Sequence, residues 1–280
     1  MEENKEKLQE ITEQPVAEEK TKKKKKKKKA GPLYYIIMFL LIAIFAISAY
    51  NVIKIGLKYY HNQKTYKEVQ QKASPEGFDG NIDFAALSQI NPDIKAWIYL
   101  KDTVIDYPIV QGTDNSTYLS KKFNGEWGGC GTLFADCATN NAFEQFVTIV
   151  YGHNMKDSTM FAPLSKYRDR EFFDSHKRLE LITPATKYHM DVVSFSYVQS
   201  DGPFYQPNVD TEDAKLNYIN LIENSYTYRS DVPISTSDKL VVLSTCVAAE
   251  GPDRYLVIGK LTPWEKQDKV QKTTKKSKSK

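Results

Sequence analysis

The sequence has few residues suited to metal binding or disulfide formation. Its 280 residues include three cysteines and four histidines, and no Cys-x-x-Cys pair. A disulfide-dense scaffold needs more cysteines, and a structural zinc site needs closely spaced ligands. The Gly-x-Ser-x-Gly elbow of α/β serine hydrolases is also absent. We therefore expect no metal and no cofactor, and look for catalysis by individual side chains.

A net excess of positive charge is absent outside the two ends of the chain. Residues 1–32 carry a net charge of +4, residues 265–280 carry +5, and residues 33–264 carry −5. The first segment contains eight consecutive lysines, Lys22–Lys29. Because like charges repel, we expect both basic tails to be disordered. The acidic centre argues against a nucleic-acid-binding domain and a nucleic-acid partner.

A long apolar segment follows the first basic tail. Residues 33–53 contain no charged side chain, and about 20 apolar residues cross a bilayer. The apolar part of a signal peptide usually has about 7–15 residues, so we predict an uncleaved transmembrane helix rather than a buried core helix. The preceding lysines outnumber those just after it. The positive-inside rule then places 1–32 in the cytoplasm and the rest outside, with 54–80 as a partly helical extracellular stalk.

The remaining segment, residues 81–264, reads as a mainly β domain. Runs rich in β-branched and aromatic residues, separated by turn residues, predict eight strands, which suit a closed barrel or a sandwich. These strands are expected at 98–100, 103–110, 131–134, 145–151, 179–183, 188–197, 239–245 and 254–261. Helical spacing predicts a helix over 213–225, capped by Thr211. A shorter helix is expected before Asn91-Pro92.

Three residues at predicted strand ends form a set sufficient for acyl transfer. Cys246 can attack as a thiolate, His153 can transfer protons, and Arg254 can stabilise an oxyanion. Taken singly, each residue type has a common structural explanation, such as a buried cysteine packed as a small hydrophobe. The histidine precedes the cysteine by 93 residues, the reverse of the order in papain-like proteases.

Three motifs, in the same order along the chain, make residues 81–261 resemble a class B sortase. They read IDYPIVQG at 105–112, YGHNM at 151–155, and LSTC at 243–246 followed by RYLVIGKL at 254–261. The resemblance implies a closed eight-stranded sortase-type β-barrel with short N-terminal helices. The helix at 213–225 would be inserted before the strand that leads to the nucleophile.

The resemblance also implies a reaction. Such sortases are membrane-anchored cysteine transpeptidases of Gram-positive bacteria. They cleave surface proteins after the threonine of an NPQTN-like C-terminal sorting signal, and an amine of a peptidoglycan precursor or a pilin resolves the thioacyl enzyme. Carried over by motif, Cys246 is the nucleophile, His153 the acid and base, and Arg254 the orienting or oxyanion-binding cation. The resemblance implies Asn115, Leu119 and Tyr228 as substrate-binding residues. Ser244 and Thr245, beside the nucleophile, are also expected to line the substrate site.

Two other functions remain open alternatives. An L,D-transpeptidase would carry His-Gly shortly before its nucleophile, where this chain has Ser244-Thr245. A non-catalytic module that binds wall polymers through its lysine tails would show no thiol reactivity at Cys246. Cys130 and Cys137 lie outside the family motifs, and the sequence does not decide between a disulfide and two free thiols.

Overall fold

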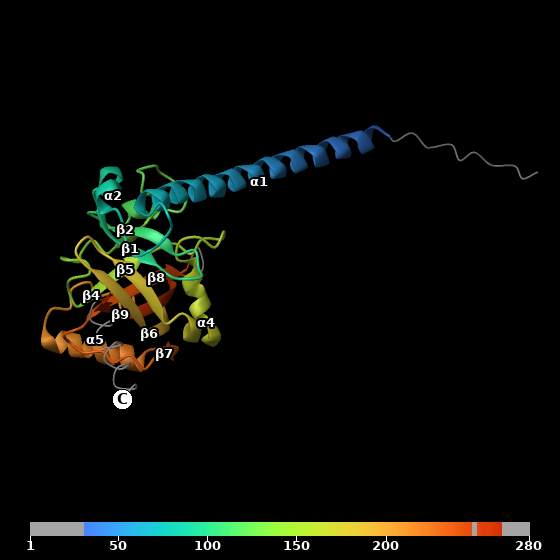
Figure 1. The fold of residues 1–280 in the computed structure, drawn as a ribbon. Helices are drawn as coiled ribbons and strands as arrows, with labels where there is room; N and C mark the ends of the chain where they lie inside the picture. Colours follow the sequence, from blue (N-terminus) through green and yellow to red (C-terminus); the bar gives the residue numbers. More distant parts are fainter. Residues whose placement is uncertain (1–30, 248–250, 265–280) are drawn as a thin grey trace, which may run out of the picture. The chain divides into compact units, whose positions relative to one another are not determined.

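Eight strands pair edge to edge into a closed ring in the computed structural model, which describes residues 31–247 and 251–264 (Figure 1). The ring order is β1-β2-β3-β4-β8-β9-β6-β5, and β5 pairs with β1 to close it. The β2–β3 and β4–β8 pairs are parallel, and the other neighbours are antiparallel. The strands are β1 (Ile94–Tyr99), β2 (Asp106–Val110), β3 (Leu133–Ala135), β4 (Val147–Tyr151), β5 (Arg178–Ile182), β6 (Lys187–Gln199), β8 (Lys239–Cys246) and β9 (Asp253–Pro263). The predicted closed eight-stranded barrel is confirmed.

A short additional strand and six helical segments complete the described fold. Strand β7 (Tyr228–Arg229) pairs with β6 beyond the part of β6 that pairs with β5. The helical segments are α1 (Pro32–Ala73), α2 (Phe84–Ile90), α3 (Thr117–Ser120), the 3₁₀ helix η1 (Ala162–Arg168), α4 (Arg170–Ser175) and α5 (Glu212–Asn224). The predicted helices at residues 213–225 and before Asn91 are both present, as α5 and α2. The Thr211 side chain accepts a hydrogen bond from the Ala214 amide, as expected of the cap.

Both faces of strand β8 are buried, which explains its unbroken apolar sequence. Successive side chains of a strand point to opposite faces. Val241 and Leu243 join the large core cluster, whereas Leu240 and Val242 join a second cluster with Tyr218 of α5. Helix α5 therefore covers one face of β8, and the large core covers the other.

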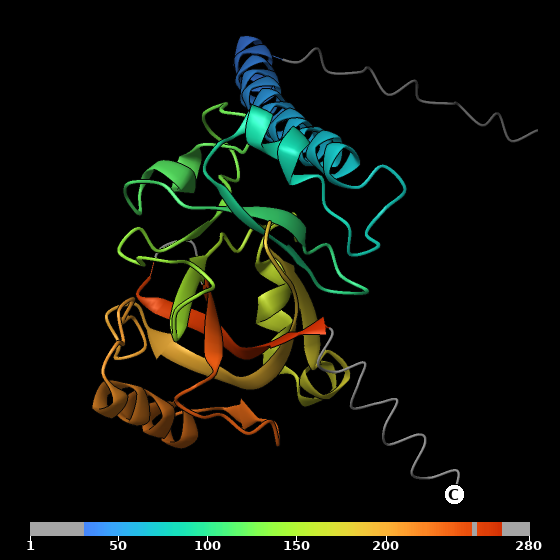
Figure 2. The same cartoon turned by 60° about the vertical axis from the view of Figure 1, so that its left-hand side comes forward.

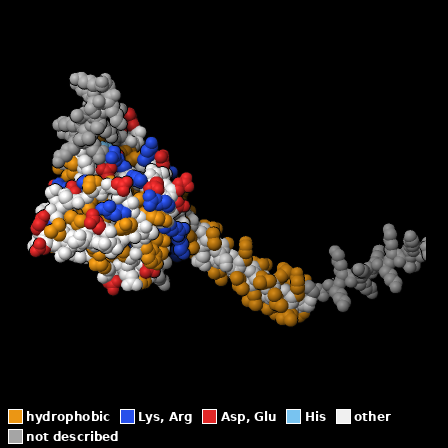
Figure 3. Space-filling model, turned by 90° about the horizontal axis from the view of Figure 1, so that it is seen from below, with side chains coloured by type: hydrophobic (Ala, Val, Ile, Leu, Met, Phe, Trp, Pro, Cys, Tyr) orange, Lys and Arg blue, Asp and Glu red, His pale blue; other side chains and the backbone are white. Residues whose placement is uncertain are grey.

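The N-terminal part of α1 differs from the rest of the chain in burial. Residues up to Val52 and residues from Ile53 onward form two separate compact units. In the first unit, the large apolar side chains from Leu33 to Val52 are exposed, and Figure 3 shows the apolar surface that they form on one face of the helix. Among the described residues, α1 is the one helix long and apolar enough to cross a membrane. The predicted tails at 1–32 and 265–280 lie outside the described residues, apart from residues 31 and 32.

The C-terminal part of α1 packs against the barrel. Tyr66, Val69 and Ala73 are buried in the large core cluster. The Gln70 amide donates to the Asp106 carbonyl at 2.8 Å. These residues fall within the segment predicted as a stalk, residues 54–80. A stripe of apolar residues three or four positions apart gives the helix a face to bury, so this part of the segment contributes to the core.

Candidate active site

The parallel pairing of β4 with β8 brings two candidate catalytic residues to the same end of the barrel. Tyr151 is the partner of Ser244 in this pair. His153 lies two residues beyond Tyr151, and Cys246 lies two residues beyond Ser244. Two residues that are 93 positions apart in the sequence are thus placed at equivalent positions along neighbouring strands, Cys246 as the last residue of β8 and His153 just past the end of β4.

Strand alternation also places the candidates on one face of the sheet. Cys246 lies an even number of residues after Leu240 and Val242, so its side chain is on the same face of β8. Leu240 and Val242 pack in the cluster beside α5. Arg254 is likewise on the same face of β9 as Leu256 and Ile258, which belong to the same cluster. It is also the direct antiparallel partner of Cys246. The candidate site therefore lies at the end of the α5-facing cluster.

A cavity of about 290 Å³ joins these side chains. It is lined by all three catalytic candidates and by four of the five predicted substrate-binding residues. The lining residues are Asn115, Leu119, Phe134, Tyr151, Gly152, His153, Ser200, Tyr205, Ser244, Thr245, Cys246 and Arg254. The thiol of Cys246 is free and the residue is half-buried.

Two hydrogen bonds tie the segment that carries His153 to the end of β8. The Gly152 amide donates to the Ser244 carbonyl at 3.1 Å. The Asn154 side-chain amide donates to the Cys246 carbonyl at 2.9 Å. These bonds flank His153 on both sides, so the spacing between its backbone and that of Cys246 is fixed by the protein itself.

The His153 ring is oriented by the short helix α3. Its Nε2 atom lies 2.7 Å from the Leu119 carbonyl oxygen. Because a carbonyl oxygen can only accept, Nε2 carries a hydrogen in this arrangement. Leu119 thus lines the cavity and also sets the tautomer and the plane of the imidazole ring.

Arg254 is held by the loop that connects β8 to β9. Its Nη1 atom donates to the carbonyls of Gly251 and Asp253, at 2.6 and 2.9 Å. The Val247 amide donates to the same Asp253 carbonyl at 3.1 Å. The guanidinium keeps its charge under all physiological conditions, so the cavity has a fixed positive group one strand away from the thiol.

A polar network supports the wall of the cavity, and the sequence did not reveal it. Buried Asp136 accepts from the Tyr151 hydroxyl at 2.8 Å and from the Asn115 side-chain amide at 3.0 Å. Burial, with the neighbouring Asp136, raises the pKa of Tyr151, which therefore stays a donor. Asn115 also accepts from the Cys137 amide at 2.8 Å. The Asn115 side chain therefore uses both its NH₂ group and its carbonyl oxygen in bonds that stabilise the wall of the cavity.

Tyr205 is a second residue of the cavity that was not predicted from the sequence. Its hydroxyl lies 2.9 Å from the Ser244 hydroxyl, and its ring stacks on that of Tyr151, with centroids 6.2 Å apart. It reaches the cavity from the connection between β6 and α5. No local pattern marks this residue, since a tyrosine in a connecting segment reads as an ordinary loop residue.

Ser244 and Thr245 are both buried next to the nucleophile. The Ser244 hydroxyl has Tyr205 as its partner. The Thr245 hydroxyl is buried and has no hydrogen-bond partner among the described residues. A buried hydroxyl without a partner is costly to the stability of the fold.

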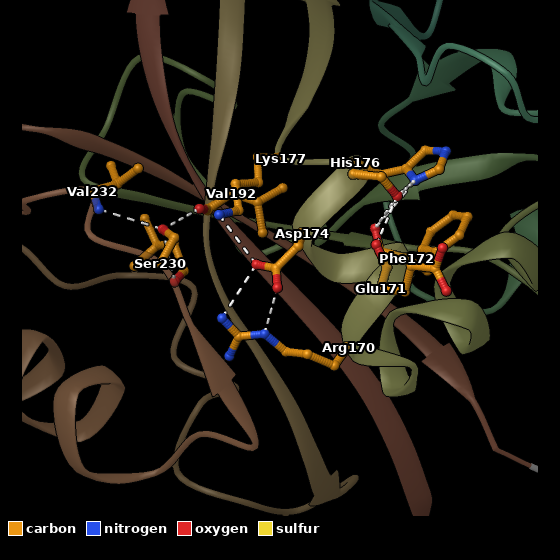
Figure 4. A network of polar contacts seen from close by, with 11 residues as sticks. Arg170, Glu171, Phe172, Asp174, His176, Lys177, Val192, Ser230 and Val232 are labelled. Carbon is orange, nitrogen blue, oxygen red and sulfur yellow. Dashed lines mark hydrogen bonds and ion pairs between the residues drawn. The ribbon is translucent and has the colours of Figure 1, made fainter.

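The structure does not bring Tyr228 to this cavity. Tyr228 lies in β7 opposite Phe195, and its ring centroid is 5.7 Å from that of Phe173. The Arg170 guanidinium of α4 lies over the Tyr228 ring at 5.5 Å. Figure 4 shows the same Arg170 bonded to Asp174, and it also shows the bond from the Ser230 hydroxyl to the Val192 carbonyl. In this position Tyr228 serves packing between α4 and the barrel.

The two other cysteines are free thiols with different surroundings. Cys137 is exposed, whereas Cys130 is buried. Cys130 lines a larger cavity, of about 380 Å³, between α1 and the β1–β2 connection. Burial raises the pKa of the Cys130 thiol to about 12, so it stays protonated and is a poor nucleophile. The smaller cavity at Cys246 is therefore the better candidate for thiol chemistry.

The closed mixed barrel, with a cysteine, a histidine and an arginine at adjacent strand ends, is the architecture of a cysteine transpeptidase of the sortase type. The chain is 30% identical to Sortase B of Listeria monocytogenes over 240 residues, which are 79% of this chain and 95% of the relative. It is 28% identical to Sortase B of Staphylococcus aureus over 228 residues, 79% of this chain and 93% of that one. This chain belongs to the sortase B family. A scan against protein-family models found no match.

Solved structures agree with this assignment. Sortase B from Bacillus anthracis in complex with AAEK1 matches with a TM-score of 0.67 and 33% identity, covering 74% of this chain and 99% of that one. The Staphylococcus aureus sortase B–substrate complex matches with a TM-score of 0.60 and 28% identity, covering 75% and 94%. The predicted family and the sortase-type fold are confirmed.

Proposed function

We propose that this enzyme cleaves an NPQTN-like C-terminal sorting signal after its threonine and transfers the surface protein to an amine. The amine belongs to a peptidoglycan precursor or a pilin. The observation that carries the proposal is that Cys246, His153 and Arg254 line one cavity. The family membership supports the reaction type, and the Staphylococcus aureus relative has been solved as a sortase B–substrate complex.

Each of the three residues has a defined role in the proposed reaction. The Cys246 thiolate attacks the threonine carbonyl carbon, and Arg254 stabilises the negative charge that develops on the carbonyl oxygen. The carbon–nitrogen bond breaks as His153 donates a proton to the leaving amine. The acceptor amine then attacks the thioester, the carbon–sulfur bond breaks, and the thiol is released with the new amide.

Four residues would contribute to substrate binding in this scheme. Asn115, Leu119, Ser244 and Thr245 line the cavity. Thr245 precedes the nucleophile directly, whereas Asn115 acts through the wall that it shares with Asp136. Leu119 adds an apolar surface that is 42% exposed.

The experiment that tests the reaction uses the purified full-length chain, an NPQTN-containing peptide and a short glycine peptide as acceptor. Mass spectrometry should detect cleavage after threonine, a thioacyl adduct on Cys246, and the ligated product. The Cys246→Ala variant should give none of these. The Cys137→Ala variant, which removes an exposed free thiol, should retain all three. A Cys246→Ala protein that still cleaves the peptide refutes the assignment, and absence of any reaction favours the wall-binding module.

We also propose that residues 33–53 anchor the protein in the cell membrane, with the N-terminus in the cytoplasm and the barrel outside. The exposed apolar surface of α1 and the lysines that precede it support this topology. Protease added to intact, wall-stripped cells should degrade the barrel and leave only the N-terminal fragment. A protected barrel would reverse the topology and remove access to surface proteins.

A further inference from the structure

One of the three sequence motifs contributes nothing to the lining of the active-site cavity. None of residues 105–112, all of which the structure describes, lines the cavity of Cys246. Tyr107 of this motif lies in β2 and is only 4% exposed. Its hydroxyl oxygen accepts a hydrogen bond from the Met160 amide at 3.3 Å. This contact connects the motif to the segment of the chain that carries His153.

Residues 153–161, here called the His153 loop, fold back on themselves. The loop follows β4, which Figure 2 shows beside β8 in the barrel. The Phe161 amide donates to the His153 carbonyl at 3.0 Å. Asn154 and Met160 face each other in an isolated antiparallel bridge. Because the two ends of the loop are joined in this way, a displacement of Met160 also displaces His153.

The second half of the His153 loop has a strained backbone. Ser158 and Met160 have φ angles of 64° and 56°, in the left-handed region that residues other than glycine rarely occupy. Such a conformation persists only where the surrounding structure holds it. Met160 is 1% exposed and packs in the large core cluster. A buried backbone amide needs a hydrogen-bond acceptor, and Tyr107 supplies the acceptor for Met160.

Tyr107 is itself held firmly in place. Its ring meets the Tyr66 ring of α1 edge to face, with the centroids 5.4 Å apart. The Tyr66 hydroxyl lies 3.1 Å from the Thr132 hydroxyl. Burial raises the pKa of Tyr107 above its ordinary value of about 10, so its hydroxyl stays neutral. The Met160 amide therefore has a neutral acceptor on a ring that cannot move freely.

We propose that Tyr107 is a positioning residue for the reaction, which acts through Met160 on His153. The Tyr107 hydroxyl fixes the strained Met160 backbone, and Met160 fixes the opposite strand of the loop at Asn154. The Asn154 side chain donates to the Cys246 carbonyl at 2.9 Å. The motif at residues 105–112 thus sets the spacing of His153 and Cys246 from outside the cavity. The proposal rests on the function proposed above.

The first test is the Tyr107→Phe substitution in the full-length chain. It removes the hydroxyl but keeps the ring that packs on Tyr66, so the variant should fold. A displacement of about 1 Å can cost on the order of 10²-fold in rate, and the loss of one long hydrogen bond should displace the loop less. We expect kcat for cleavage of the sorting peptide to fall by about 10-fold, with KM little changed, because the lining of the cavity is the same.

Tyr167→Phe is the matched control. Tyr167 is fully buried, and its hydroxyl donates to the His176 carbonyl at 2.7 Å. Both residues belong to the described part of the chain, and neither lines the cavity of Cys246. Thermal unfolding should show a loss of stability in both tyrosine variants, whereas kcat should fall only in Tyr107→Phe. Equal kcat values in the two variants would show that the Tyr107 hydroxyl contributes to stability alone.

A double variant tests whether Tyr107 acts through the His153 loop. Tyr107→Phe and Asn154→Ala each release one side of the bridge between Asn154 and Met160. Substitutions that act on one shared element are not additive. The double variant should therefore lose clearly less activity than the product of the two separate losses. Losses that multiply would mean that Tyr107 acts by a route independent of the loop, and the proposal would be wrong.

Hydrogen exchange gives a measurement that does not depend on cleavage. Loss of the Tyr107 acceptor should speed amide exchange by about 10-fold or more in peptides that cover residues 153–161, because local opening becomes easier. Exchange rates in these peptides that match those of wild type would refute the positioning role. A wild-type protein that cleaves no sorting peptide would instead refute the proposed function, and hydrogen exchange would still decide whether Tyr107 holds the His153 loop.

Discussion

Asn154 provides the sharpest test of how the active site is assembled. Its side chain spans from the His153 segment to the carbonyl of Cys246 at 2.9 Å. The Asn154→Ala substitution removes this bond without changing any of the three residues proposed to react. It therefore separates the positioning of the reacting groups from their chemistry.

The expected magnitudes follow from the loss of one hydrogen bond. A single bond contributes about 0.5–1.5 kcal/mol to stability, which lowers the melting temperature of a domain of this size by about 2–4 °C per kcal/mol. The effect on catalysis should be larger, because a displacement of about 1 Å can cost on the order of 10²-fold in rate. We expect kcat for peptide cleavage to fall by about 10–100-fold, with KM little changed.

The assay is steady-state cleavage of a fluorogenic sorting peptide, with thermal unfolding measured on the same preparation. Asn224→Ala is the matched control, because Asn224 also donates from its side chain to a backbone carbonyl, that of Asn220 at 2.7 Å, but on α5. Equal kcat values for the Asn154→Ala and Asn224→Ala proteins would refute the argument. A loss confined to KM would show that Asn154 acts on substrate binding instead.

Three further results are expected. His153→Ala should lower the rate of cleavage by about 10²–10⁴-fold. An active His153→Ala protein alongside an inactive His189→Ala protein would assign the acid–base role to His189 instead. Arg254→Lys should lose most activity, because a single ammonium does not reproduce the planar array of guanidinium donors; retention of wild-type kcat/KM would contradict this. The bonds from Lys122 and His61 hold the pKa of Glu126 at about 2, below its ordinary 4.5. Because this folded-state pKa is depressed, the bonds stabilise the fold above the ordinary pKa and are lost as pH falls through the folded value. The stability advantage of wild type over Glu126→Gln, measured by urea unfolding, should therefore shrink as pH is lowered from 5 toward 2.

Local patterns in the sequence were sufficient to predict the strands and two of the helices. Strand β8 is an apolar run because both of its faces are buried, and α5 begins where Thr211 can cap it. These features depend on neighbours in the sequence or on simple burial. The same holds for His153, Cys246 and Arg254, whose positions at strand ends follow from the strand pattern together with the motifs.

The parts of the site that were not predicted depend on contacts between distant segments. Asp136 bonds Tyr151 and Asn115, which lie in different segments of the chain, so these bonds form only in the folded barrel. No spacing in the sequence indicates them. Tyr228 was matched as a tyrosine that follows the inserted helix, but in the structure it pairs with β6 and lies against Arg170 of α4. The docking of α1 residues 62–73 was missed because their apolar stripe is short and lies among polar residues.

The parallel β4–β8 pair has a consequence for when the enzyme becomes active. In a chain made from its N-terminal to its C-terminal end, His153 appears well before Cys246, since 93 residues separate them. Strand β8 sits between β4 and β9 in the ring, so the barrel stays open until the last two strands arrive. Pairing between such distant segments forms slowly. The Cys246 thiol accordingly meets the His153 segment only once β8 has paired with β4, which ties the proposed reaction to a completed barrel.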